Sequence, residues 1–341
     1  MFPTKKALLI GIDNYDSSKL VGCVNDVIKL DYLLSIHDDK FPNFERKLML
    51  APLNQNSVVI ENDQKEEFLK INTNKMLEGI KELFSHKAEL ALLYYSGHGF
   101  INEFGGFLVA QDGENYDAGV RMRDIMTIIE RASKKKIIQE IIVILDCCHS
   151  GLFGNVSDLE PEIAKIPQGV TIIAACEHFE FATCNSRGGI LTKGICNALN
   201  GGGADPLGNI TAMSLYSHLT GSLSSAWSTQ TLVFKTNITK KYNIIKKCHP
   251  DFEFSILKLI PNLFKDINYE YILTPSMITI DECGDQILDG IAKRFLKLMK
   301  LGMIEIIGNE DIVYAIINSS KCRLTPLGRY YWRKLKIDNK T

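Results

Sequence analysis

The chain has 341 residues, of which 45% are hydrophobic and 23% are charged, and its formal net charge at pH 7 is −1. This length allows a large core and more than one domain, and the composition is that of an ordinary globular protein. The nearly neutral charge argues against a surface that is directed as a whole toward nucleic acid or membrane.

The cysteines and the apolar runs bear on the cellular compartment. Nine cysteines occur without the spacing of a disulfide framework, and the segment Met1–Lys6 leads into a strand-like run without the apolar core of a signal peptide. No apolar run reaches the roughly 18 residues that span a bilayer. We therefore expect free thiols, a cytoplasmic location and no membrane partner.

From the N-terminus to Lys235, short apolar runs alternate with amphipathic segments. This alternation predicts an α/β fold with a mostly parallel sheet and helices on both faces. Several runs are nearly continuous in Leu, Ile and Val, as in strands that are covered on both sides. The predicted strands are Ala7–Ile12, Lys47–Ala51, Leu90–Tyr95, Ile141–Leu145, Val170–Ala175 and Thr231–Lys235. The predicted helices are Cys23–Ile36, Asn74–Phe84, Arg123–Ala132, Leu191–Leu199 and Ala212–Leu219.

The rest of the chain has a different pattern, which predicts a small second α+β domain. Polar residues with paired lysines predict a linker at 240–251, between a first domain at 1–239 and a second at 252–341. The elements expected in the second domain are helices at Phe252–Phe264 and Ile287–Leu301, a β-hairpin of Met303–Ile307 with Ile312–Ile317, and a last helix that Thr325 caps and Pro326 begins. Helices followed by a hairpin resemble a winged helix-turn-helix domain.

Two short motifs follow apolar strands at glycine-containing turns: Tyr95–Gly99 (YSGHG) and Asp146–Gly151 (DCCHSG). Ligand chemistry in an open α/β sheet gathers at the carboxyl ends of the strands, so we expect the two motifs to meet. A histidine and a cysteine brought together there suit a cysteine nucleophile with a general base, because the thiolate is the reactive form. A buried histidine with an inert thiol is the structural alternative, which leaves the flanking Gly and Ser residues unexplained.

Strand alternation distinguishes the two adjacent cysteines. Asp146 and Cys148 share one face, whereas Cys147 points to the other. Cys148 also lies at the turn, so it is the predicted nucleophile and Cys147 is a predicted core residue. By the same alternation, Ser96 and His98 share a face.

Backbone amides at the same turns are candidates for an oxyanion hole, those of Gly99 and Cys148 in particular. A metal site made of Cys147, Cys148 and His149 is disfavoured, because consecutive strand residues point to opposite faces and cannot converge.

The motifs Ser96–Gly99 (SGHG) and Asp146–Gly151 (DCCHSG) resemble the catalytic signature of the caspase-like cysteine peptidases, particularly the metacaspase and orthocaspase branch. The resemblance covers roughly residues 5–236 and includes Gly22–Asp26 and Thr171–Cys176. It implies a three-layer α/β/α sandwich around a mostly parallel six-stranded sheet.

The resemblance also implies roles for individual residues. His98 is the implied general base, and Cys148 is the implied nucleophile, which forms a thioester with the substrate. The residues implied to line the S1 pocket are Cys23, Asp26, Ser96 and Asp146. Two carboxylates beside the nucleophile favour a basic P1 side chain, so we expect cleavage after Arg or Lys. The alternative for Asp26, at a predicted helix start, is a favourable interaction with the helix dipole.

Calcium activates many metacaspases, and this chain departs from their pattern. Asp112 and Asp124 are the candidate ligands, but Arg123 and Asn155 stand where the resemblance leads us to expect further acids. Calcium takes several hard oxygen ligands, so two carboxylates are a weak set. We therefore expect no cofactor.

The leading hypothesis is a cysteine endopeptidase that acts on proteins or peptides and binds a regulatory partner through its C-terminal domain. The alternative is a catalytically silent caspase-like scaffold or a DNA-linked regulator. DNA would approach basic residues of the last domain, namely Lys293, Arg294, Lys297 and Lys300. The nearby acids Asp281, Glu282, Asp285 and Asp289 favour a solvated mixed-charge helix instead. The candidate self-cleavage sites are Lys134–Lys136, Lys165, Arg187 and the linker lysines.

Overall fold

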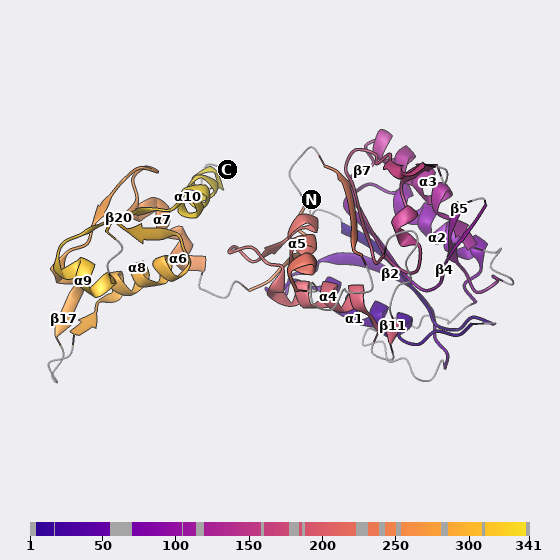
Figure 1. The fold of residues 1–341 in the computed structure, drawn as a ribbon, viewed down its shortest axis with the longest axis horizontal. Coiled ribbons are helices and arrows are strands. Elements are labelled where there is room, and N and C mark those ends of the chain that lie inside the picture. Colours follow the sequence, from indigo (N-terminus) through magenta and orange to yellow (C-terminus); the bar gives the residue numbers. More distant parts are fainter. Residues whose placement is uncertain are drawn as a thin grey trace. The chain divides into compact units, whose positions relative to one another are not determined.

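The structure is a computed structural model, and Figure 1 shows its fold. The residues that it describes are 5–16, 18–54, 70–103, 105–113, 119–157, 160–176, 184–185, 188–222, 231–238, 243–249, 254–280, 286–308 and 311–338. The chain divides into two compact units, unit 1 at residues 1–249 and unit 2 at residues 250–341. Within the described ranges, no helix has the length and apolar character that crossing a membrane requires.

Unit 1 is built on a six-stranded sheet with the strand order β14-β10-β7-β3-β1-β2. The bounds are β1 Lys5–Ile12, β2 Phe44–Ala51, β3 Ala88–Ser96, β7 Ile138–Asp146, β10 Val170–Ala174 and β14 Val233–Asn237. All neighbours run parallel except β14, which is an antiparallel edge strand beside β10. All six predicted strands are present, and the prediction of a mostly parallel α/β sheet is confirmed.

Helices cover both faces of this sheet and give the predicted three layers (Figure 1). The bounds are α1 Cys23–Ser35, α2 Thr73–Ser85, α3 Met122–Lys134, α4 Ile190–Asn197 and α5 Ala212–Ser222. One core lies between the sheet and α2 and α3, and the other lies between the sheet and α1, α4 and α5. We call the two sides the α2–α3 face and the α1–α4 face.

Side chains alternate between these two faces along the buried strands. On β7, Ile141, Val143 and Leu145 lie in the core of the α2–α3 face, whereas Ile142 and Ile144 lie in the core of the α1–α4 face. The same alternation occurs on β3. Since successive side chains of a strand point to opposite faces, the last residues of β3 and β7 have their faces fixed by the strand before them.

Smaller sheets that the sequence pattern did not predict complete unit 1. The bounds are β4 Gly99–Asn102, β5 Gly105–Val109, β6 Gly119–Arg121, β8 Asn155–Ser157, β9 Glu160–Ala164, β11 Cys184–Asn185, β12 Gly188–Gly189, β13 Asn209–Ile210 and β15 Lys246–Lys247. The strands β4, β5 and β6 form a three-stranded antiparallel sheet, and the others form antiparallel pairs. These strands are short and rich in glycine or polar residues, so they lack the apolar runs that identified the central strands.

Residues 243–249, which fall in the predicted linker, belong to unit 1 instead. Ile245 and Cys248 are buried in the core of the α1–α4 face, and β15 pairs with β13. Lys246 is buried with its Nζ atom 3.3 Å from Oδ1 of Asp38. The paired lysines indicated a solvated segment, but the ion pair compensates for the burial of one of them.

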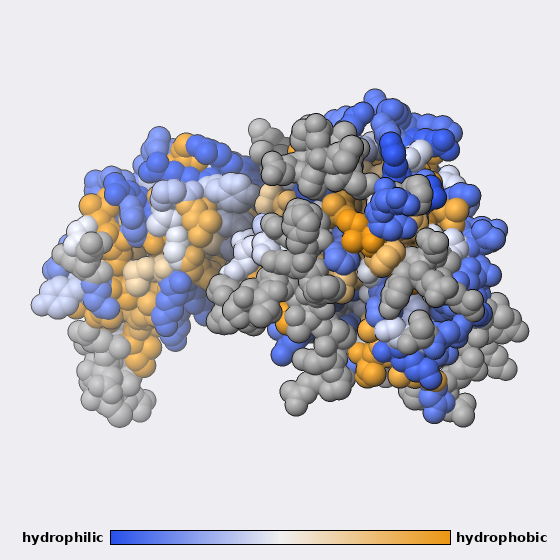
Figure 2. All heavy atoms as spheres, turned by 45° about the vertical axis from the view of Figure 1, so that its right-hand side comes forward, coloured by the Kyte–Doolittle hydropathy of each residue, from blue (hydrophilic) through white to orange (hydrophobic). Residues whose placement is uncertain are grey.

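Unit 2 is a smaller α+β unit with a three-stranded sheet of order β16-β20-β19. The bounds are α6 Phe254–Lys258, α7 Ile260–Leu263, β16 Tyr271–Ile272, β17 Ile278–Ile280, β18 Gln286–Leu288, α8 Gly290–Lys300, β19 Ile304–Ile306, α9 Ile312–Ile317, β20 Lys321–Leu324 and α10 Pro326–Asp338. The predicted helix at 252–264 is split in two, with Pro261 in the first turn of α7. Figure 2 shows apolar side chains among the hydrophilic ones on the visible face of this unit.

The predicted β-hairpin of Met303–Ile307 with Ile312–Ile317 is wrong. β19 pairs with β20 instead, and Ile312–Ile317 is the helix α9. Asp311 caps this helix, since its Oδ1 atom accepts a hydrogen bond from the amide of Val313 at 2.8 Å. A short apolar run is compatible with a strand or a helix, and the capping aspartate favours the helix. The hairpin was part of the winged-helix resemblance of the C-terminal domain, and that resemblance stays a prediction.

The final helix begins as predicted. Pro326 is its first residue, and the Oγ1 atom of Thr325 accepts a hydrogen bond from the amide of Gly328 at 3.1 Å. The predicted helix at Ile287–Leu301 begins at Gly290, because Gln286–Leu288 forms β18 and pairs with β17.

The double-sided packing of β7 leads to a first prediction. Ile144 is 1% exposed in the core of the α1–α4 face, so Ile144→Ala removes buried methyl groups and leaves a cavity. We expect a loss of about 2–5 kcal/mol in the free energy of unfolding of unit 1. Urea unfolding of the whole chain, fitted with one transition for each unit, measures this loss. Tyr32→Ala is the control, because Tyr32 is 64% exposed; equal losses in the two variants would contradict the assigned core.

Candidate active site

His98 follows the end of β3, and two tyrosines hold its main chain. Its amide donates to the hydroxyl of Tyr15 at 3.0 Å, and its carbonyl oxygen accepts from the hydroxyl of Tyr95 at 2.7 Å. The ring of Tyr15 also lies against the imidazole, with ring centroids 4.6 Å apart. Burial raises the pKa of both phenols, so both hydroxyls stay protonated. The position of His98 is therefore set by side chains of the α2–α3 core.

One ring nitrogen of His98 has a defined partner. The Nε2 atom lies 2.7 Å from the carbonyl oxygen of Ser18. Because a carbonyl oxygen only accepts hydrogen bonds, Nε2 carries a hydrogen, and in the neutral imidazole Nδ1 has the lone pair. In this arrangement Nδ1 is the ring nitrogen that can accept a proton.

Cys148 lies in the turn that follows β7. It is half-buried, whereas Cys147 is fully buried in the core of the α2–α3 face, as strand alternation predicts. Burial raises the pKa of the Cys147 thiol well above its usual value, so this thiol is inert at neutral pH. His149 then has the left-handed backbone conformation, with φ 57°, and leads into a 3₁₀ turn at Ser150–Leu152. Of the two adjacent thiols, Cys148 is the accessible one.

The structure brings the histidine and cysteine motifs together. β3 and β7 are parallel neighbours, and Ser96 at the end of one pairs with Asp146 at the end of the other. Beyond the strands, Gly99 packs so closely on the turn that a Cβ atom there would overlap the carbonyl oxygen of Cys148. Glycine is therefore required at this position by contact between the two motifs. The oxyanion-hole role of the Gly99 and Cys148 amides stays a prediction.

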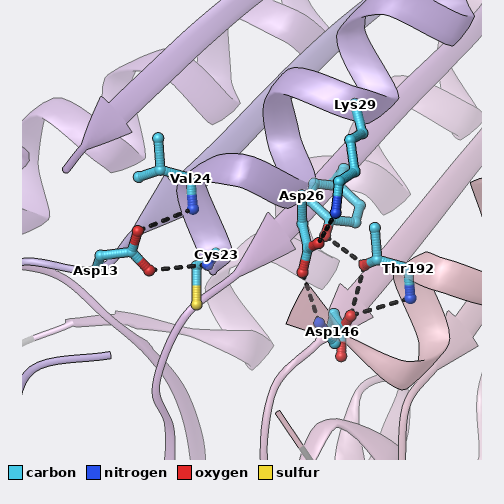
Figure 3. Close-up of polar contacts among 9 residues, drawn as sticks. Asp13, Cys23, Val24, Asp26, Lys29, Asp146 and Thr192 are labelled. Atoms are coloured by element: carbon cyan, nitrogen blue, oxygen red, sulfur yellow. Dashed lines mark hydrogen bonds and ion pairs between the residues drawn. The ribbon is translucent and has the colours of Figure 1, made fainter. Parts of the chain in front are cut away.

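Two buried carboxylates lie beside this turn, on the α1–α4 face. Asp26, in the first turn of α1, is 1% exposed, and Asp146, at the end of β7, is 6% exposed. Figure 3 shows their side chains grouped with Thr192, while Lys29 extends toward Asp26. The hydroxyl and the amide of Thr192 both donate to Oδ2 of Asp146, at 2.5 and 3.2 Å. Because the Thr192 hydroxyl donates to the acid, it accepts in turn from the hydroxyl of Tyr94 at 2.6 Å.

Burial opposes the ionisation of both acids. Burial is the largest cause of the raised pKa of Asp26, which reaches about 7, and the charge of Asp146 raises it further. A hydrogen bond from the Gly189 amide and the Lys29 ammonium, 3.8 Å away, act in the opposite direction. Burial also raises the pKa of Asp146, against the hydrogen bonds from Thr192. A cation that entered between these acids would favour their ionised forms.

The start of α1 is fixed by a residue that the sequence analysis missed, Asp13. Its two carboxylate oxygens accept from the amides of Cys23 and Val24, at 2.8 and 3.3 Å. The N-cap position is Gly22, which has φ 112° and no side chain, so Asp13 supplies the cap from the end of β1 (Figure 3). The detectable signal was an aspartate directly after a strand and ahead of a helix without a capping side chain.

The remaining predicted pocket residues lie at the same end of the sheet. Cys23 is buried at the first position of α1, and Ser96 is buried at the end of β3. A segment that the sequence analysis did not single out, Gly188–Gly189, packs directly against the two acids. A Cβ atom on Gly188 would overlap the carboxylate of Asp26, and one on Gly189 would overlap that of Asp146. Two adjacent glycines ahead of a predicted helix were the only sequence signal.

Among the described residues, the candidate calcium ligands Asp112 and Asp124 belong to no cluster of acids, histidines or cysteines that could hold a metal ion. Asp112 accepts hydrogen bonds from the amide and the hydroxyl of Thr73, both at 2.9 Å, at the start of α2. Asp124 is exposed in the first turn of α3. Across the described residues, no three His, Cys, Asp or Glu side chains are grouped closely enough to hold a metal ion. Calcium takes roughly six to eight oxygen ligands, so these residues do not fit it.

A three-layer α/β/α fold with a histidine and a cysteine at neighbouring strand ends defines the caspase-like class. The chain belongs to the Caspase domain family, whose model matches residues 4–256. This family consists of cysteine peptidases, which are hydrolases that act on protein or peptide substrates.

A solved structure of low sequence identity has the same fold. Caspase-1 from Spodoptera frugiperda is 12% identical, with a TM-score of 0.50, and the alignment covers 72% of this chain and 93% of that one. A protein from Geobacter sulfurreducens is 13% identical, with a TM-score of 0.48, and the alignment covers 72% of this chain and 98% of that one. Curated protein sequences give no significant match.

The contact between Gly99 and Cys148 leads to a second prediction. Gly99→Ala forces the Cys148 backbone away, and a displacement of about 1 Å at a reactive group costs on the order of 100-fold in rate. We expect iodoacetamide to alkylate Cys148 at least about tenfold more slowly in this variant, as measured by mass spectrometry of the Cys148 peptide.

Gly221→Ala is the matched control, because a Cβ atom at Gly221 meets nothing within 4 Å. An unchanged alkylation rate in a folded Gly99→Ala protein would show that the two motifs are not in contact.

Proposed function

We propose that the chain is a cysteine endopeptidase that cleaves peptide bonds after Arg or Lys, with His98 as general base and Cys148 as nucleophile. The observation that carries the proposal is the buried carboxylate pair, Asp26 and Asp146, at the strand end that bears Cys148. A buried pair of acids is costly without a cation, and the guanidinium or ammonium of a P1 side chain supplies one.

The proposed reaction proceeds in two steps, formation of a thioester and its hydrolysis. Nδ1 of His98 takes the thiol proton of Cys148, and the thiolate sulfur attacks the carbonyl carbon of the scissile bond. The resulting oxyanion accepts hydrogen bonds from the amides of Gly99 and Cys148. As the C–N bond breaks, the imidazolium returns its proton to the leaving amine, and a thioester remains. Neutral His98 then takes a proton from water, whose oxygen displaces the thiolate and releases the carboxylic acid.

The proposed preference for a basic P1 residue rests on the charges of Asp26 and Asp146. Asp146 accepts the hydroxyl and the amide of Thr192 on Oδ2, and in this proposal the P1 cation meets its other oxygen, Oδ1. Asp26 already attracts one ammonium, that of Lys29, across 3.8 Å. The anionic P1 side chain that an Asp-specific peptidase binds would add a third negative charge to this site.

Unit 2 is proposed to recruit a regulatory protein partner. It is compact by itself, and its winged-helix-like arrangement is supported by the sheet order β16-β20-β19, in which the last strand lies in the middle. The basic side chains of α8 are exposed, namely Lys293, Arg294, Lys297 and Lys300. Asp289 is used as the N-cap of this helix and accepts from the Ala292 amide at 2.6 Å.

Self-cleavage after a basic residue is a further part of the proposal. Lys134–Lys136, at the end of α3, and Lys165 are exposed, as such sites require. Lys246 is buried, which disfavours it. Arg187 and the linker residues Lys240 and Lys241 lie outside the described residues.

A peptide panel tests the proposed activity. We expect the full-length chain to release a reporter from peptides that end in Arg or Lys and not from those that end in Asp, and Cys148→Ala to abolish this release. Asp146→Ala is expected to lower kcat/KM for the Arg peptide at least about 100-fold, since a buried partner of the cation is removed. Asp146→Asn keeps the shape and the Thr192 contact, and it is expected to lose most of the same activity.

Either of two results would overturn the proposal. If a folded Asp146→Asn protein cleaved the Arg peptide as fast as the wild type, the acid pair would not determine the P1 preference. Limited trypsin digestion tests whether the chain must itself be cleaved to become active. If neither the full-length chain nor the trypsin-cleaved chain cleaved any peptide, a catalytically silent scaffold would be favoured.

The raised pKa of Asp26 predicts pH-dependent binding of a P1 cation. With a pKa of about 7, Asp26 is mostly neutral at pH 6 and mostly ionised at pH 8, so cations bind better at the higher pH. We expect the inhibition constant of N-acetyl-arginine amide to fall about tenfold from pH 6 to pH 8, because its guanidinium stays charged throughout. In Asp26→Asn the inhibition constant should change less between pH 6 and pH 8, and it should be higher than in the wild type at pH 8. An equal slope in the two proteins would assign the titration to another group.

A further inference from the structure

Lys235 makes three hydrogen bonds to the chain that follows the nucleophile. It lies on the edge strand β14, where it pairs with Ile172 of β10. Its Nζ atom donates to the carbonyl oxygens of Gly151 and Phe153, at 2.5 and 3.1 Å, and to Oδ1 of Asn155. An ammonium has three N–H donors, so it can donate to all three oxygens at once.

The segment that Lys235 holds is the 3₁₀ turn that Cys148 enters. This turn runs over Ser150–Leu152, so its last carbonyl groups have no partner within the turn itself. Phe153 is buried in the core of the α2–α3 face, which places the segment on the side of β10 to which Lys235 points. A positive charge at the carbonyl end of the turn is favourable electrostatically as well as through its hydrogen bonds.

The turn is also held by Cys176, which follows β10. The amide of Gly151 donates to the carbonyl oxygen of Cys176 at 2.9 Å, directly after β10. The thiol of Cys176 donates in turn to the carbonyl oxygen of Cys147 at 3.4 Å. Both contacts are between neutral groups, whereas Lys235 supplies charge-assisted hydrogen bonds, which are roughly twice as strong.

Oxygen atoms gathered around one positive charge are also the ligands of a hard metal ion. Here the amide oxygen of Asn155 and two main-chain carbonyls surround an ammonium that belongs to the chain itself. The two candidate calcium ligands have other surroundings: Asp112 binds Thr73 and Asp124 is exposed. The cation that holds this turn is therefore the side-chain ammonium of Lys235, which is part of the chain itself.

We propose that Lys235 is a positioning residue for Cys148: its ammonium fixes the nucleophile turn in place of a bound calcium ion, so that the reaction needs no calcium. The proposal rests on the proposed peptidase function for its kinetic readout. The alkylation rate of Cys148 provides a second readout, which does not depend on any substrate.

The test compares Lys235→Met, Lys235→Arg and the control Lys81→Met, which removes an exposed lysine from α2. The kinetic measurements are kcat and KM for an Arg reporter peptide, in EGTA and in millimolar calcium. The chemical measurement is the rate at which iodoacetamide alkylates Cys148 between pH 5 and pH 9, followed by mass spectrometry. Thermal unfolding of the full-length proteins shows whether each variant is folded.

We expect Lys235→Met to lower kcat at least about tenfold while KM changes less than about twofold, because the acid pair is untouched. Its alkylation profile should shift to higher pH, since the thiol is displaced from His98. Lys235→Arg should recover part of both properties, and the wild-type rate should be equal in EGTA and in calcium.

Three results would overturn the proposal. One is a folded Lys235→Met protein with wild-type alkylation. Another is wild-type activity that is lost in EGTA and restored by calcium. The third is a failure of both Lys235→Met and Lys235→Arg to fold, which would make Lys235 a residue required for the stability of unit 1 and not a positioning residue. If no peptide is cleaved but the alkylation profile shifts as expected, the positioning role stands and the peptidase proposal fails.

Discussion

The parallel pairing of β3 with β7 is the constraint on which the rest of this site depends. It aligns Ser96 with Asp146, so both strands end at the same level of the sheet, and the chain then turns into the His98 and Cys148 segments side by side. A shift of one residue would send each terminal side chain to the opposite face. The alternation of large apolar residues toward two separate cores prevents that shift, because every misplaced side chain would leave its own core. The cores therefore specify the active-site register as well as the stability.

The same end of the sheet concentrates three buried acids, and each is stabilised by a different donor. Asp13 accepts amides at the start of α1, Asp26 accepts the amide of Gly189, and Asp146 accepts the hydroxyl and amide of Thr192. These hydrogen bonds lower the pKa values that burial raises, and burial has the larger effect in all three cases. Folding thus gathers at one end of the sheet three acids whose ionisation is opposed by burial.

Sequence reasoning succeeded where the signal was local and periodic. Six apolar runs predicted the central strands, and alternation alone placed Cys147 in the core. It failed for the run Ile312–Ile317, whose six apolar residues fit a strand as well as a helix until the capping role of Asp311 is considered. It could not find Gly188–Gly189 or Lys235, because their contacts with Asp26, Asp146 and the nucleophile turn join positions far apart in the chain. No spacing rule records such contacts, and the composition of Gly-Gly or of a single strand lysine is unremarkable.

The two faces of the sheet divide the work of the site. On the α2–α3 face, Tyr15 and Tyr95 fix the main chain of His98, and Lys235 fixes the turn that carries Cys148. On the α1–α4 face, Asp26, Asp146 and Thr192 form a buried polar cluster. His98 and Cys148 follow the ends of β3 and β7, so both faces of the sheet border the segments that carry them. In the proposed peptidase, buried charge on one face of the sheet sets the substrate preference, and hydrogen bonds to the backbone from the other face set the nucleophile geometry, so substitutions on one face should alter one property and leave the other.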